Sequence, residues 1–198
     1  MNGAMFVFLT SPVFLFNRII GVFSSGGTMA VGIILRSCTK VLDLVGGVLV
    51  YGVIFIDGRT DLYIIRDGPL TARRYRGEIL RRIVVPYAAA IGDDFILMDD
   101  NCRPHRANLV EDFLFEEGIV RMEWPACFPD MDPIEHVWDA LGRRDAGRQP
   151  PPQTLQDLER ALLEEWDRIP QLVINSPIDS MPQRCSTLLA VRGNHTPY

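Results

Sequence analysis

The alternation of apolar and polar positions divides the chain into short strands and amphipathic helices. Residues 48–55 are apolar and rich in β-branched side chains, which is typical of a buried strand. Asp57-Gly58 predicts a tight turn, and residues 61–65 have the pattern of the returning strand of a hairpin. Two further short strands are predicted at Phe95–Met98 and Ile119–Met122.

Apolar residues spaced by three or four positions predict helices between and after these strands. Helix-capping residues precede several of them, and Gly118 or a proline follows others. The predicted helices start at Ala72 behind Thr71, run over 107–117, 133–144 and 155–166 behind Thr154, and continue more weakly after Pro170. A hairpin followed by alternating helices and strands predicts an α/β fold with a mixed sheet flanked by helices.

Composition narrows the class of protein. The chain has 198 residues, 47% of them hydrophobic and 23% charged, which predicts one globular domain with a core. The net charge of −5 argues against a strong free-standing DNA binder. None of the four cysteines forms a C-x-x-C pair, so we expect reduced thiols in an intracellular compartment rather than a zinc site or a disulfide framework.

Charge is scarce at the start of the chain. Residues 1–56 contain only Arg18, Arg36, Lys40 and Asp43 as charged residues. The apolar run 4–16 is interrupted and shorter than the roughly 20 residues of a membrane span, and no Lys or Arg precedes it as in a signal peptide. A membrane-anchored protein therefore remains only a third hypothesis.

Two acids stand in positions that suit metal chemistry. Asp100 ends an apolar run of strand length, and strand ends line the active crevice of open α/β sheets. Neighbouring strand side chains point to opposite faces, so only one of Asp99 and Asp100 can face a site. The alternative is an ordinary Asp-Asp-Asn turn.

Glu135 also has two interpretations. Asp132 suits an N-cap, Pro133 the first helical position, and Glu135 the third position of a capping box, which needs no catalysis. Glu135 also lies at the edge of the apolar stripe that includes Trp138 and Leu141, where a metal ligand has to be. We expect these two apolar residues to pack on the sheet that carries Phe95–Met98.

The frames around both acids carry a family resemblance. Asp100-Asn101 is followed by Pro104-His105, and residues 124–135 read Trp-Pro-Ala-Cys-Phe-Pro-Asp-Met-Asp-Pro-Ile-Glu, with 34 residues between the two acids. The chain resembles, from about Val48 to Tyr198, the catalytic domain of Tc1/mariner transposases of the Tc1-like branch. It departs from the family motif at Phe128, Met131 and Asp132.

The resemblance implies a ribonuclease H-like fold and a DDE-type nuclease that cuts DNA and transfers strands. Asp100 and Glu135 would be the catalytic residues and the ligands of Mg²⁺ or Mn²⁺, with Asn101 and His105 supporting them. The helix that starts at Ala72 carries Arg73, Arg74 and Arg76, which would contact phosphates or else form a solvated face. DNA, specifically transposon ends, would be the partner, together with a second copy or a related transposase, in the nucleus.

One feature of the family is not matched. The first acid of the family's catalytic set lies on the first strand, and family spacing would put it close to Thr10-Ser11-Pro12, yet no acid occurs before Asp43. The helix-turn-helix modules of complete family members are not seen either. We therefore expect a degenerate transposase fragment: a divergent apolar segment over 1–47, an incomplete catalytic core over 48–148, and a linker with a helical segment over 149–198. Impaired catalysis is the first hypothesis, and a non-catalytic DNA- or transposase-binding remnant is the alternative.

Overall fold

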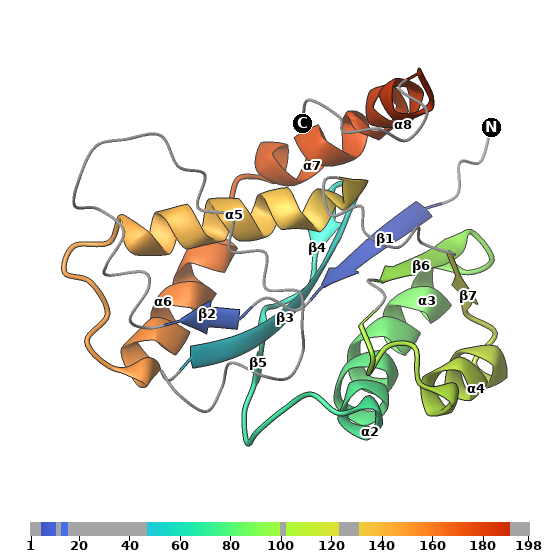
Figure 1. Ribbon diagram of the computed structural model, residues 1–198, viewed down its shortest axis with the longest axis horizontal. Coiled ribbons are helices and arrows are strands. Elements are labelled where there is room, and N and C mark those ends of the chain that lie inside the picture. Colours follow the sequence, from blue (N-terminus) through green and yellow to red (C-terminus); the bar gives the residue numbers. More distant parts are fainter. Residues whose placement is uncertain (1–4, 11–12, 16–46, 100–101, 123–130, 191–198) are drawn as a thin grey trace.

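The sheet combines strands of the expected core with two strands from the segment before it. The computed structural model describes residues 5–10, 13–15, 47–99, 102–122 and 131–190 (Figure 1). The strand order is β2-β3-β1-β6-β7, and β4 and β5 pair with the two ends of β3. β1 is antiparallel to β3 and parallel to β6, so the predicted mixed sheet is confirmed. The strands are β1 Met5–Thr10, β2 Val13–Leu15, β3 Gly47–Phe55, β4 Gly58–Arg59, β5 Tyr63–Ile65, β6 Phe95–Asp99 and β7 Val120–Arg121.

The helices follow the predicted pattern with one change of geometry. The helix behind Thr71 forms, but its middle part, η1, is π-helical, with the Val85 N–H donating to the Leu80 carbonyl. Apolar spacing alone does not distinguish this geometry from an α-helix. The helical segments are α2 Ala72–Arg74, η1 Tyr75–Val84, α3 Val85–Ile91, α4 Asn108–Glu116, α5 Pro133–Ala146, α6 Leu155–Asp167, α7 Gln171–Asp179 and α8 Met181–Ala190.

Two hydrophobic clusters cover the two faces of the sheet. Tyr51 and Leu97 belong to the cluster that η1 and α4 complete. Met98 belongs to the other cluster, which contains Trp138 and Leu141 of α5 and the buried faces of α6 and α7. The predicted packing of Trp138 and Leu141 on the sheet that carries Phe95–Met98 is therefore confirmed.

Gly52 allows the second cluster to close tightly. The rings of Trp138 and Trp166 stack with their centroids 5.1 Å apart. A Cβ atom on Gly52 would lie 2.9 Å from each of these two rings. The indole N–H of Trp166 donates to the Thr60 carbonyl at 2.8 Å, which fixes the position of α6 over the hairpin.

The apolar N-terminal run contributes to the sheet. Its residues Met5–Thr10 and Val13–Leu15 form β1 and β2. Across the described ranges, no helix combines the length and apolar character that crossing a membrane requires.

Candidate active site

The ends of β1 and β6 lie side by side in the middle of the sheet. The two strands run in the same direction, with Leu9 opposite Asp99 and Thr10 one position further on (Figure 1). Thr10 also pairs with Gly52 of β3, and α5 lies against β1. Carboxyl ends of adjacent strands are where open α/β sheets bind ligands. The register therefore places the Thr10 position next to the end of β6.

Asp99 faces the side of the sheet away from α5. Its side chain is buried, and the Oδ2 atom accepts from the Tyr75 hydroxyl and from Arg121 Nη1, both at 3.4 Å. Met98, its predecessor, packs in the cluster that contains α5. Met98 and Asp99 thus point to opposite faces of the sheet, as neighbouring strand residues do. The charge of Asp99 is offset by Arg121.

Glu135 lies in the first turn of α5, as predicted. Asp132 is the N-cap, with its Oδ1 accepting from the Ile134 N–H at 3.3 Å, and Pro133 is the first helical residue. The backbone N–H of Glu135 donates to the Asp132 carbonyl at 3.2 Å. Glu135 is partly exposed, whereas Ile134 is fully buried. The capping arrangement thus leaves Glu135 at the edge of the buried face.

Asp100 and Asn101 lie outside the described residues, so the proximity of Asp100 to Glu135 stays a prediction. Among the residues that the structure does describe, no three His, Cys, Asp or Glu side chains are grouped to hold a metal ion. At the Thr10 position the chain offers at most a neutral hydroxyl, and Asp99 is paired with Arg121. The described residues alone therefore do not supply the three carboxylates that the family resemblance implies.

His105 belongs to the network around Asp99. Its buried ring stacks on Tyr75 with centroids 4.0 Å apart, and its backbone N–H donates to the Cys102 carbonyl. Arg121 Nη1 donates to the His105 carbonyl at 2.8 Å, and Nη2 of the same side chain pairs with Glu111. Arg121 thereby connects β6, the segment before α4, and α4 itself.

Sequence reasoning missed Tyr75 and Arg121 in this network. In the sequence, Tyr75 belongs to the predicted helix that starts at Ala72, and Arg121 belongs to the predicted strand Ile119–Met122. The available signal was a single arginine within the short apolar strand 119–122. A cation in a buried strand requires a partner.

The three arginines predicted to contact phosphates have different surroundings. The guanidinium of Arg74 pairs with Glu78 at 2.7 Å and donates to backbone carbonyls of the loop before α2, including that of Arg66 at 2.6 Å. Arg73 is exposed and Arg76 half-buried. Neither of these two takes part in an ion pair within the described part of the chain. Arg74 therefore stabilises the loop, while Arg73 and Arg76 have no acidic partner there.

Comparison with solved structures shows which fold the chain has. The structure resembles the Mos1 mariner transposase catalytic domain, with a TM-score of 0.70 and 16% identity over 98% of this chain and 84% of that one. It also resembles a Mos1 pre-cleavage transpososome, with a TM-score of 0.73, 16% identity, and coverage of 98% and 57%. The chain thus has the ribonuclease H-like fold of a DDE transposase catalytic domain.

Sequence relatives identify the family. The chain is 34% identical over 109 residues to the Tc1 transposase of Caenorhabditis elegans, covering 54% of the chain and 39% of that protein. It is 31% identical over 146 residues to the Tcb1 transposase of Caenorhabditis briggsae, covering 72% and 48%. No protein-family model matches the chain. The chain is a Tc1/mariner transposase relative, and the region matched spans about half the length of these proteins or less.

Proposed function

We propose that this chain is a Tc1-like transposase core whose family reaction is metal-dependent cleavage and strand transfer of DNA, and that the chain itself does not cleave DNA. The observation that carries this proposal is the register of β1 and β6. The last residue of β1, Thr10, follows Leu9, which pairs with Asp99 at the end of β6. Family spacing would put the first acid close to Thr10, which supports the proposal. Solved Mos1 relatives include a complex with a transposon end and catalytic-domain structures with Mg or Mn. DNA and a divalent cation are thus the expected partners of the family fold.

Asp100 and Glu135 are the proposed surviving ligands. Side chains of β6 alternate between the faces, with Met98 toward the cluster that contains α5 and Asp99 toward η1. Continuing this period of two would direct Asp100 toward the helix that carries Glu135. Mg²⁺ is a hard ion that gives up its water reluctantly, so two carboxylates without the third would bind it weakly.

Strand cleavage tests this proposal. The purified chain is incubated with transposon-end DNA in Mg²⁺ or Mn²⁺ and compared with the double variant Asp100→Ala, Glu135→Ala. We expect no nicking above that of the double variant. Thr10→Asp is the matched gain-of-function variant, and metal-dependent nicking by it would support the missing-ligand explanation. If the unmodified chain nicks DNA and the double variant does not, the proposed impairment is wrong, and Asp43 is the first acid to substitute.

A second proposed function is non-catalytic binding of DNA or of a related transposase, and the surface of α2 and η1 favours it. Arg73, Arg81 and Arg82 are exposed, and none of them forms an ion pair among the described residues. Such arginines suit phosphate contacts. Arg74 is less suitable, because its guanidinium is engaged with Glu78 and the preceding loop.

The affinity of the chain for the same transposon-end DNA tests this second function. The Arg73→Gln, Arg82→Gln variant should weaken binding and lower its salt dependence, since each lost phosphate contact removes about one from the slope. Arg160→Gln on α6 is the control, because that exposed arginine pairs with Asp157. An equal effect of both substitutions would reject this surface. A nuclear location and assembly with a second copy would be consequences of either function.

A further inference from the structure

Asp145 is a buried acid without a hydrogen-bond donor. It lies in the last turn of α5 with no exposed surface, and neither carboxylate oxygen has a hydrogen-bond partner among the described residues. The carboxyl end of a helix carries the negative end of the helix dipole, which disfavours an anion there. A buried charge is costly unless it is paired and hydrogen-bonded. Both effects favour the protonated, neutral form of the Asp145 carboxyl group.

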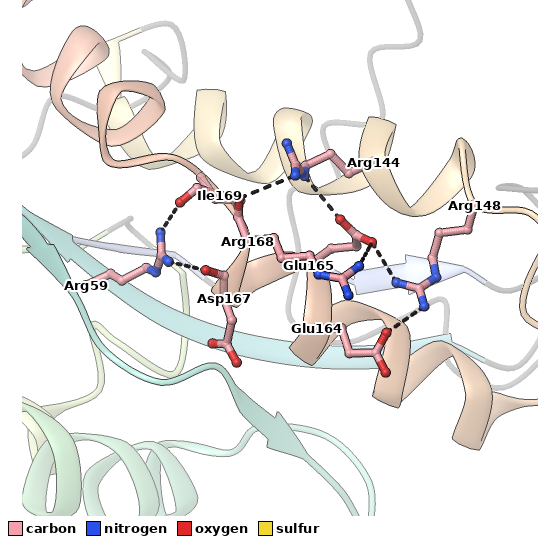
Figure 2. Close-up of polar contacts among 8 residues, drawn as sticks. All are labelled: Arg59, Arg144, Arg148, Glu164, Glu165, Asp167, Arg168 and Ile169. Atoms are coloured by element: carbon pink, nitrogen blue, oxygen red, sulfur yellow. Dashed lines mark hydrogen bonds and ion pairs between the residues drawn. The ribbon is translucent and has the colours of Figure 1, made fainter.

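The arginines near Asp145 form ion pairs with Glu164 and Glu165 instead. Glu165 of α6 accepts from Arg144 at 3.2 Å and from Arg148 at 2.6 Å, and it also pairs with Arg168 at 3.5 Å (Figure 2). The second terminal nitrogen of Arg148 donates to Glu164 at 2.6 Å. Three arginines thus surround Glu165, while the carboxylate of Asp145 next to them accepts no hydrogen bond from any residue that the structure describes.

The cavity beside Arg148 and Glu165 also offers no arginine that is left without an acidic partner among its described lining residues. It has a volume of about 500 Å³ and is lined by the proline-rich turn after α5 and by α6, including Arg148, Arg160 and Arg168. Each of these three arginines already pairs with an acid.

We propose that Asp145 is a proton-binding site that makes the packing of α5 on α6 acid-stabilised. Arg148 and Glu165 are the charged groups that act on it, with opposite signs. Protonation removes the uncompensated charge and the repulsion from Glu165. The face of α6 that carries Glu165 should then hold the end of α5 more firmly.

The direction of the pH effect follows from the titration of Asp145. Burial raises the pKa of Asp145 from its ordinary value of 3.8 to about 6, Arg148 opposes this rise, and Glu165 adds to it. A raised pKa in the folded state means that folding takes up a proton. The stabilising contribution is complete below pH 3.8 and is lost as the pH rises through about 6.

Thermal unfolding of the full chain between pH 4.5 and 7.5 tests the proposal. Asp145→Asn should raise the Tm at pH 7.5 by roughly 5 °C relative to the wild type. The difference should shrink toward pH 4.5, because the wild-type carboxyl is then protonated. Asp112→Asn on the exposed side of α4 is the matched control and should leave the Tm difference flat with pH.

A direct titration makes the test independent of any variant. The side-chain carboxyl carbon of Asp145 in the wild-type chain, followed by NMR, should titrate with a midpoint near pH 6. A midpoint below pH 4.5, or a Tm difference between Asp145→Asn and wild type that does not change with pH, would overturn the proposal.

Discussion

Gly52 shows how one residue determines the spacing between the sheet and two helices. The rings of Trp138 and Trp166 occupy the space where a Cβ atom would stand. Gly52→Ala should therefore destabilise the chain by about 1–3 kcal/mol, as overpacking of a filled core does. Denaturant-induced unfolding measures this difference.

Gly77 of η1 provides the control for this prediction. A Cβ atom there would meet nothing within 4 Å. Gly77→Ala should be neutral or stabilising by up to about 1 kcal/mol, because alanine loses less backbone entropy on folding. Equal destabilisation by both alanines would show that backbone freedom, rather than the indole contact, makes Gly52 necessary.

The structural roles of individual residues could be predicted where their partners are close in sequence. The N-cap Asp132 and the first helical residue Pro133 act within one turn of α5. The role of Arg121 was not predictable, because its contacts with Asp99, the His105 carbonyl and Glu111 form only in the folded chain. The Arg74–Glu78 pair is local, and only the contacts of Arg74 with loop carbonyls depend on the fold. Asp99 lies 22 residues before Arg121, and nothing in the local pattern connects them.

At the scale of elements, α5 carries the candidate ligand at its start and the packing side chains behind it. Trp138 is buried in the cluster that contains Met98, and its ring stacks on Trp166. Trp138→Ala should cost about 3–5 kcal/mol, as expected for a large buried side chain. Urea unfolding measures the loss, and Trp138→Phe should recover part of it. A loss below about 1 kcal/mol would show that α5 does not depend on this contact.

Element positions followed from apolar periodicity, but details of their geometry did not. The helices at 107–117 and 133–144 were found within two residues of their predicted ends. The π-helical geometry of η1 was not predicted, since the residues that face the core are compatible with both kinds of helix. Its first residue, Tyr75, also donates through its hydroxyl to Asp99, a contact that helical periodicity cannot predict.

At the scale of the whole molecule, the apolar character of residues 5–10 did not predict that β1 lies in the middle of the sheet. Met5–Thr10 pairs with Phe95–Asp99 and with β3, both far away in sequence. Pairing over such distances leaves no local periodicity to detect. The mixed α/β class was predictable from the order of elements, whereas the central position of β1 required the structure.

Arg59 connects parts of the molecule that are far apart in sequence. Its Nη1 donates to the Ile169 carbonyl at 2.6 Å and its Nη2 to the Asp167 carbonyl at 2.7 Å (Figure 2). The guanidinium also lies 5.9 Å from the centre of a Trp166 ring. It thus joins the hairpin to the end of α6, where helix carbonyls lack partners within the helix.

Arg59→Lys should destabilise the chain even though the charge is kept. A lysine ammonium does not reproduce the planar fork that reaches two carbonyls. The expected loss is about 1–3 kcal/mol in denaturant unfolding, with faster hydrogen exchange of the amides between α6 and α7. Arg66→Lys is the matched control, because Arg66 is exposed and its ion pair with Glu159 should change stability much less. If both lysine variants behave alike, the fork of Arg59 does not hold the hairpin to the helical layer.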